Sequence, residues 1–176
     1  MRIAIAGVTG SGKTTLCRRV AARTGLPHTE LDSLQHGPDW EPRPQFLNDV
    51  ARLVAEPAWV TEWQYRHARP LITARADVLV WLDPPYPVAF WRVLRRTLRR
   101  RWHREVLWNG NVEGPLWRVF VDRDHLLRWS WRTRAKIPAQ LDDARRERPD
   151  VRVVRLRTAA DVDAWLASLP ARSPGT

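Results

Sequence analysis

The stretch that most constrains this chain is residues 7–14, GVTGSGKT, which directly follows the apolar run at 2–6. It fits the pattern G-x-x-x-x-G-K-[ST] at every fixed position. Glycines permit the positive backbone torsions that turn successive N–H groups inward and so create an anion-binding concavity. Apolar residues then recur at helical spacing, at Leu16, Val20 and Ala21. The order of strand, glycine loop and helix predicts a phosphate-binding loop at the start of an α/β sheet.

This loop also supplies the predicted nucleotide contacts. Lys13 would reach the β- and γ-phosphates of ATP, and the Thr14 hydroxyl would be a ligand of Mg²⁺. The helix that starts near Lys13 adds its positive N-terminal end. The residues that we predict to bind nucleotide here are Gly7, Thr9, Gly10, Ser11, Gly12, Lys13, Thr14 and Thr15.

Apolar runs alternate with helical patterns along the rest of the chain. The predicted strands lie at 2–6, 28–31, 59–62, 78–82 and 151–156, and the predicted helices at 45–56, 71–76, 88–101, about 116–148 with a break near Pro138, and 160–169. This alternation predicts the α/β fold of P-loop NTPases, a five-stranded parallel sheet with helices on both faces. We expect one domain over residues 1–170, an arginine-rich lid at about 99–116, and a flexible tail at 171–176.

Charge and composition limit the kinds of molecule that this protein is expected to bind and the compartment in which it is expected to work. The net charge is +11 and comes almost entirely from arginine, because Lys13 and Lys136 are the only lysines. Such a balance indicates anionic partners, either nucleotide phosphates or nucleic acid. The alternative explanation for the charge is a preference for arginine over the whole chain, with no relation to a partner. Cys17 is the only cysteine, so no intramolecular disulfide can form. Without a long apolar run or room for a signal peptide before residue 2, we expect a cytoplasmic protein that does not enter a membrane.

Missing motifs exclude some classes of phosphate-loop protein. A switch GTPase would need the guanine-reading sequence N-K-x-D, and this chain has none. A motor or AAA-type ATPase would need a longer chain with a sensor region after the sheet. A compact kinase that phosphorylates nucleotides or small alcohols is what remains.

The order of these features resembles the adenylate-kinase-like P-loop kinases, in particular the bacterial proteins labelled topology-modulation proteins. The likeness extends over most of the chain and is carried by GVTGSGKTT at 7–15, HTELDSL at 28–34, Trp40, Phe46, WVTEWQY at 59–65, RADVLVWLDPP at 75–85 and LWNGNVE at 107–113. The chain departs from the family after the third strand, where Glu62-Trp63 replaces the usual Asp-Gly or Glu-Gly pair. The resemblance implies a kinase that uses ATP and Mg²⁺. It also implies that Arg92 lies over the adenine, that Arg96 touches phosphate, and that the chain at Arg157 lines the base.

The remaining arginines predict a lid. Arg92 and Arg96 are spaced i, i+4 and therefore share one face of the predicted helix. The lid expected at about 99–116 begins with the arginines at 99–104, and together with arginines on the returning helix it would exclude water and bring guanidiniums to the transition state. We expect Arg96, Arg101 and Arg132 to stabilise the transferring phosphoryl group, with a solvated basic face as the alternative.

Carboxylates end three of the predicted strands, at the edge where ligands bind in open α/β sheets, although Pro84 and Pro85 indicate a structural turn at Asp83. Asp32 would orient the acceptor, act as general base or hold a metal-bound water, although it could instead cap a helix. Glu62 is the predicted acidic residue of the metal site beside Thr14. The predicted acceptor pocket contains Asp32, Trp40, Glu62, Gln64, Tyr65 and Arg66, with Trp63 as an aromatic wall and core packing as the alternative for Trp40.

These patterns leave three functions open. The first is a kinase whose acceptor is a nucleoside, a nucleotide or a similar small metabolite. The second is a nucleic-acid-associated NTPase or regulator that uses basic and aromatic side chains to hold a strand. The third is a kinase for a sugar, a shikimate-like acid or an antibiotic, which Asp32 and the absence of glycine after Glu62 would suit.

Overall fold

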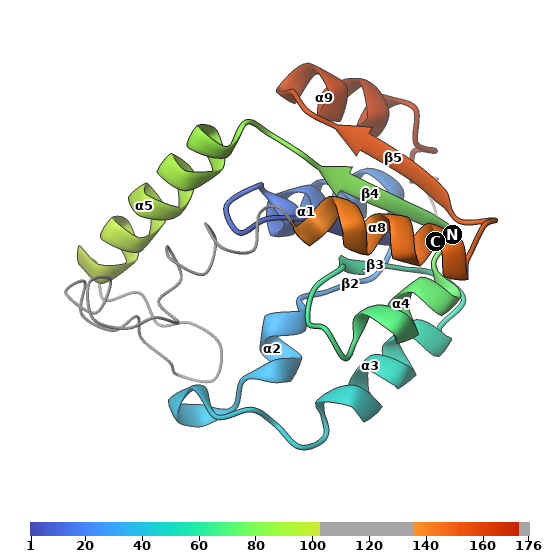
Figure 1. The fold of residues 1–176 in the computed structure, drawn as a ribbon, viewed down its shortest axis with the longest axis horizontal. Helices are drawn as coiled ribbons and strands as arrows, with labels where there is room; N and C mark the ends of the chain where they lie inside the picture. The colour runs from blue at the N-terminus through green and yellow to red at the C-terminus, as the bar shows by residue number, and fades with distance from the viewer. Residues whose placement is uncertain (103–135, 173–176) are drawn as a thin grey trace.

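The computed structural model describes residues 1–102 and 136–172, without the side chains of residues 100 and 101 (Figure 1). The strands of its sheet are β1 (Arg2–Gly7), β2 (His28–Thr29), β3 (Trp59–Glu62), β4 (Val78–Leu82) and β5 (Arg152–Leu156). All neighbouring strands pair in parallel, in the order β2-β3-β1-β4-β5. The predicted five-stranded parallel sheet is therefore confirmed.

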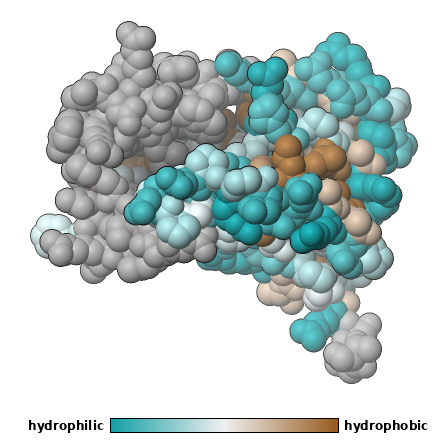
Figure 2. All heavy atoms as spheres, turned by 90° about the horizontal axis from the view of Figure 1, so that it is seen from below, coloured by the Kyte–Doolittle hydropathy of each residue, from teal (hydrophilic) through white to brown (hydrophobic). Residues whose placement is uncertain are grey.

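Helices connect these strands and cover both faces of the sheet (Figure 1). They are α1 (Lys13–Thr24), α2 (Leu31–Gln35), the 3₁₀ helix η1 (Pro38–Trp40), α3 (Phe46–Ala55), α4 (Arg69–Arg75), α5 (Tyr86–Trp102), α8 (Lys136–Glu147) and α9 (Ala159–Ala167). None of the helices within the described ranges is both long enough and apolar enough to cross a membrane. In the face shown by Figure 2, hydrophilic side chains surround a small apolar patch.

The central strand divides the core into two layers, because successive side chains of a strand point to opposite faces. Ile3 and Ile5 of β1 are fully buried in the cluster that α1 and α9 cover. Ala4 and Ala6 are fully buried in the other cluster, which α3, α4 and α8 cover. Burial of apolar surface on both faces holds the sheet between its helices and fixes the edge where the strands end.

The second predicted strand is shorter than expected. The chain leaves β2 after Thr29, and Leu31 already begins α2. The Leu31 N–H donates a hydrogen bond to Oε2 of Glu62 at 3.1 Å, so this backbone group bonds a side chain instead of extending the strand ladder. Asp32 therefore lies in the first turn of a helix, and the prediction that it ends a strand was wrong.

Predicted boundaries elsewhere in the chain also change by a few residues. Helix α4 begins at Arg69, two residues before the predicted start, with Pro70 in its first turn, where its missing N–H leaves no helical bond unmade. Pro138 lies within α8, so the predicted break at this residue does not occur in the described helix. The predicted stretch from 116 to 135 lies outside the described residues.

Candidate functional site

The phosphate loop joins β1 to α1 at the carboxyl-terminal edge of the sheet. Gly10 has a φ of 82°, and Gly12, the residue before α1, has a φ of 103°. A side chain at Gly10 would also collide with the Ala89 carbonyl and the Val93 side chain of α5. Glycine therefore serves two purposes at this position, since it adopts the left-handed conformation and lets α5 pack against the loop.

The predicted loop residues occupy one continuous turn of chain. Thr9 and Thr14 are half-buried, Ser11 is buried, and Thr15 is exposed on α1. Nζ of Lys13 donates hydrogen bonds to the carbonyl oxygens of Gly7 at 3.1 Å and Val8 at 3.3 Å. The Lys13 side chain thus folds back over the loop, which is also where a phosphate group would bind.

The electrostatic surroundings of Lys13 link the loop to both predicted carboxylates. Burial lowers the pKa of Lys13, while the nearby charges of Glu62 and Asp32 oppose this effect and Arg96 adds to it. The four charged groups therefore interact at the same edge of the sheet, although they come from α1, β3, α2 and α5.

Thr14 and Glu62 form a directed pair. Oγ1 of Thr14 donates to Oε1 of Glu62 at 2.6 Å, and Oε2 of Glu62 accepts from the Leu31 N–H. Glu62 is only 2 % exposed, and its burial raises its pKa above the ordinary 4.5, against the effect of the Thr14 hydrogen bond. With its proton directed to Glu62, the Thr14 hydroxyl keeps its lone pairs for a cation.

This pair fits Mg²⁺, a hard cation that prefers oxygen ligands. Both carboxylate oxygens of Glu62 already accept hydrogen bonds from the protein, so Glu62 would act on the cation through Thr14. Direct contact between Glu62 and Mg²⁺ stays a prediction. In the described parts of the chain, no three or more His, Cys, Asp or Glu side chains gather as a metal site.

Asp32 is held by side chains from the turn that follows β3. Its Oδ1 accepts hydrogen bonds from Nε2 of Gln64 at 2.7 Å and from Oη of Tyr65 at 2.5 Å. Oη of Tyr65 also lies 3.1 Å from Nε2 of His36. Oδ2 of Asp32 accepts no hydrogen bond from the described residues, so this oxygen is available to the hydroxyl of an acceptor molecule.

Tyr65 takes a backbone conformation that is unusual for a residue other than glycine. Its φ is 59°, in the left-handed region, which costs roughly 1–2 kcal/mol for an L-residue. Burial, together with the charge and hydrogen bond of Asp32, raises the pKa of Tyr65 far above its ordinary value of 10. The phenol therefore stays protonated and donates to Asp32 wherever the protein is folded at ordinary pH.

Helix α5 carries Arg92 and Arg96 four residues apart, so they share one helix face as predicted, and Arg92 contacts the loop. Nη1 of Arg92 donates to the Ser11 carbonyl at 3.3 Å. Arg96, one turn later, is half-buried and close enough to lower the pKa of Lys13. Arg101 belongs to the last turn of α5, but its side chain, all of Arg132 and the predicted lid beyond residue 102 lie outside the described part.

The predicted aromatic residues separate into two environments. Trp40 is 37 % exposed and meets the His36 ring edge-on at 5.3 Å, so it lies beside the Asp32 network and outside the core. Trp63 is 3 % exposed in the α3–α4 layer, where its Nε1 donates to Oγ1 of Thr73 at 2.9 Å. The prediction of Trp63 as a pocket wall was wrong, because its ring is buried in the core and lines neither of the two hollows described below.

Arg157 lies beyond the end of β5. Its backbone N–H donates to Oδ2 of Asp161 at 2.8 Å, within the turn that caps α9. Its guanidinium is 3.9 Å from Oδ2 of Asp83, which Arg155 contacts at 2.5 Å. The part of Arg157 in lining a nucleotide base stays a prediction.

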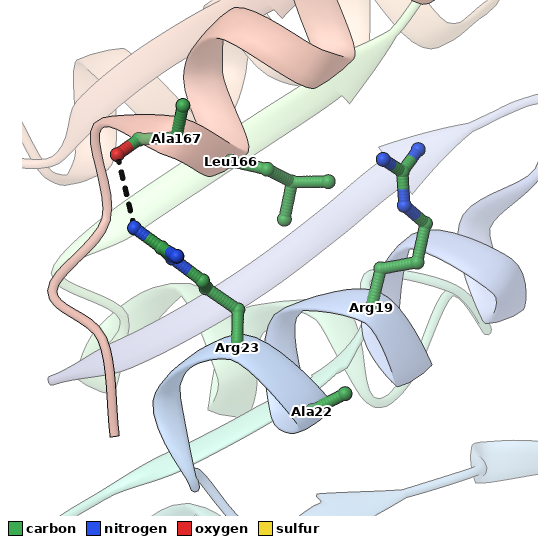
Figure 3. Close-up of a pocket in the computed structure, with 5 residues that line it drawn as sticks. All are labelled: Arg19, Ala22, Arg23, Leu166 and Ala167. Atoms are coloured by element: carbon green, nitrogen blue, oxygen red, sulfur yellow. Dashed lines mark hydrogen bonds between the residues drawn. The ribbon is translucent and has the colours of Figure 1, made fainter. Parts of the chain in front are cut away.

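Among the hollows on the described surface, we compare two that differ in chemistry. The larger, about 440 Å³, lies between α1 and α9 and is lined by Arg19, Ala22, Arg23, Leu166 and Ala167 (Figure 3). The smaller, about 320 Å³, is lined by Gln35, Arg43, Pro44, Phe46, Leu47, Tyr65, Arg66 and His67. The larger adjoins the second half of α1, away from the phosphate loop, whereas the smaller adjoins Asp32 through Tyr65. The predicted acceptor residues Tyr65 and Arg66 both line the smaller one.

Sequence reasoning missed His36 and Arg43. Both lie between the predicted strand at 28–31 and the predicted helix at 45–56, where no helix was predicted, so helical spacing was not applied there. The available signal was the separation of four residues between Asp32 and His36, which places them near each other around one helical turn.

The fold belongs to a known class. The sequence matches no protein-family model and no curated protein sequence. The structure resembles a gluconokinase from Sinorhizobium meliloti 1021 (21 % identity, 94 % of this chain and 91 % of that chain, TM-score 0.53). It also resembles shikimate kinases from Aquifex aeolicus (16 %, 96 % and 95 %, TM-score 0.52) and, in complex with shikimate, from Acinetobacter baumannii (19 %, 93 % and 87 %, TM-score 0.54).

These likenesses establish the fold of the small P-loop kinases, which was predicted. The finer resemblance to the topology-modulation proteins stays a prediction.

Proposed function

We propose that this protein is an ATP- and Mg²⁺-dependent kinase that transfers the γ-phosphoryl group to a hydroxyl of a small acceptor. The observation that carries the proposal is the meeting of Lys13 and Asp32 at one edge of the sheet, because Thr14 beside Lys13 donates to Glu62, and Glu62 accepts from the Leu31 N–H beside Asp32. One group suits the phosphoryl donor and the other suits an acceptor hydroxyl.

On the donor side, backbone N–H groups of the loop would hold the phosphates, and Lys13 would exchange its carbonyl partners for phosphate oxygens. Thr14 would hold Mg²⁺, whose charge neutralises that of the β- and γ-phosphates. Glu62 keeps the Thr14 proton directed away from the cation. Arg92 and Arg96 reach the same region from α5 and would bind developing negative charge.

On the acceptor side, Oδ2 of Asp32 would take the proton of the acceptor hydroxyl. The acceptor oxygen bonds to the γ-phosphorus while the bond to the bridging oxygen of ADP breaks, and ADP leaves. Gln64 and Tyr65 fix the carboxylate by occupying Oδ1. A general base held in this way typically contributes 10²–10⁴-fold.

The structural neighbours support an acceptor with free hydroxyl groups. The acceptors named for these neighbours, gluconate and shikimate, are both small polyhydroxy compounds. A nucleoside also carries hydroxyls and stays within the proposed class. A pocket of about 320 Å³ beside Tyr65 is of the size that small ligands occupy.

The test is ADP release from Mg·ATP by the purified protein against sugars, sugar acids, hydroxy acids, nucleosides and nucleoside monophosphates. We expect strong stimulation by one small hydroxyl compound, with a phosphorylated product identified by mass. The Lys13→Ala variant serves as the control for contaminating kinases. Slow hydrolysis that no small acceptor changes would contradict the proposal.

A second candidate, the nucleic-acid-associated NTPase, is favoured by the outer face of α5. Trp91 is 60 % exposed and Trp102 is 87 % exposed. Arg95 is also exposed and lies on the same face, since these residues are spaced i, i+4 and i+11. Aromatic rings interleaved with arginine suit stacking on single-stranded DNA. ATP hydrolysis that DNA stimulates, together with DNA binding that weakens steeply as the salt concentration rises, would favour this candidate. Hydrolysis that does not depend on salt, in a protein that binds no DNA, would contradict it.

A further inference from the structure

We infer that the pocket beside Tyr65 binds an anionic group of the acceptor, either a carboxylate or a phosphate ester, and that Arg66 is its specificity-determining residue. The inference rests on the proposed function, because it places the reacting hydroxyl at Asp32 and the anionic group farther out. It adds a charge requirement that hydroxyl chemistry alone does not impose.

The first argument is the position of the pocket. Gln35, one of its lining residues, lies three positions after Asp32 on α2 and therefore on the same side of that helix. Tyr65 lines the pocket and at the same time donates its hydroxyl proton to Asp32. Its ring packs edge-on against Phe46 at 5.1 Å, which forms part of the floor. One small molecule could therefore reach Asp32 with one end and the pocket with the other.

The second argument is charge. The lining contains the two cations Arg43 and Arg66 and no carboxylate. Arg43 is oriented by the Leu34 carbonyl at 3.3 Å and is paired with Asp49 at 3.2 Å, so part of its charge is neutralised. Arg66 makes no hydrogen bond or ion pair with the residues that the structure describes, and the residue is exposed. It is thus the lining cation whose donors remain available to a ligand.

The third argument comes from the other hollow, which also has two arginines. There Arg19 pairs with Asp163 at 2.6 Å, and Arg23 donates to the Ala167 carbonyl at 3.4 Å (Figure 3). Both arginines of that hollow already have protein partners, and no predicted catalytic residue lines it. A free cation next to a candidate general base distinguishes the pocket beside Tyr65.

The experiment uses the full chain saturated with Mg·ADP, so that the phosphate loop is filled before any anion is added. Unfolding temperature and dissociation constants are then measured for matched pairs that differ mainly in the anionic group: D-gluconate and D-sorbitol, D-glucuronate and D-glucose, AMP and adenosine. The first two pairs test a carboxylate and the third tests a phosphate ester. We expect at least one anionic member to bind and its neutral counterpart to bind at least tenfold more weakly.

The variant Arg66→Gln should weaken binding of that anion by about tenfold to a hundredfold, the effect of losing a charge-assisted hydrogen bond. Arg66→Lys should recover part of the loss. Arg23→Gln, which removes the same charge from an exposed arginine in the other hollow, should leave binding unchanged. Mg·ADP affinity should be equal in all of these proteins.

Several results would overturn the inference: equal binding of the neutral partner in every pair, binding by none of the anions, or full affinity in Arg66→Gln. Failure of the proposed function looks different, because the wild-type chain would then bind no Mg·ADP or would phosphorylate no acceptor. If anion binding depends on Arg66 but no phosphoryl transfer occurs, the anion subsite would be supported and the proposed kinase activity would be contradicted.

Discussion

The donor and acceptor sides of the candidate site are built in different ways. The donor side is one continuous segment, residues 7–15, whose left-handed glycines and helix start define it locally. The acceptor side combines side chains from α2, the start of α3 and the turn after β3. Nucleotide chemistry in this fold therefore follows from a short motif, whereas acceptor specificity depends on side chains that can change without disturbing the sheet.

The strongest test of this division is Lys13→Ala. We expect turnover with every acceptor to fall by about 10³-fold or more, because Lys13 is the cation that the loop directs at the transferred group. Circular dichroism and the unfolding temperature should stay close to wild type, since within residues 1–102 and 136–172 Nζ donates only to loop carbonyls. Normal turnover in this variant would contradict the donor-side mechanism.

The variant Asp32→Asn should separate the two sides. The amide oxygen can still accept from Gln64 and Tyr65, so the geometry of the turn is kept while the base is lost. We expect transfer to the acceptor to fall by about 10²–10³-fold, with Mg·ADP affinity and slow acceptor-independent hydrolysis unchanged. Both reactions are measured by ADP release in the presence and absence of acceptor. A parallel loss in the two would show that Asp32 belongs to the donor side.

Glu62→Gln tests a residue that lies between the two sides. We expect apparent Mg²⁺ affinity in the ATPase assay to fall by about 10–100-fold, as for other residues that orient a metal ligand. Because the bound cation favours ionised Glu62, wild-type affinity should decline as the pH falls. Burial raises the pKa of Glu62, so this decline should begin at a pH above the ordinary 4.5. Glu62→Gln should show no such dependence, and an identical decline in both proteins would contradict the assignment.

Prediction from sequence succeeded where local rules decide the structure. The loop motif, the apolar strands and the pairing of Arg92 with Arg96 on one helix face depend on short-range patterns, and the structure has all three. Even Asp32 was located at the correct edge, although in a helix rather than at the end of a strand.

Where prediction failed, a long-range contact decides the outcome. The start of α2 depends on a hydrogen bond between Leu31 and Glu62, which are 31 residues apart. Trp63 enters the core because α4 offers it Thr73, and no pattern around residue 63 shows that partner. The orientation of Asp32 likewise depends on a tyrosine 33 residues away. Such contacts exist only after the sheet has formed, so the acceptor side could be predicted as a set of residue types but not as a geometry.

The smallest expected effect belongs to Tyr65→Phe, which removes one of the two donors to Asp32 and keeps the ring against Phe46. We expect kcat/KM to fall by about tenfold near neutral pH, the cost of one hydrogen bond to a charged group. The high pKa of Tyr65 means that no alkaline limb should disappear with it. An unchanged kcat/KM would show that Tyr65 only fills space, and the loss of an alkaline limb would show that the phenol itself titrates during turnover.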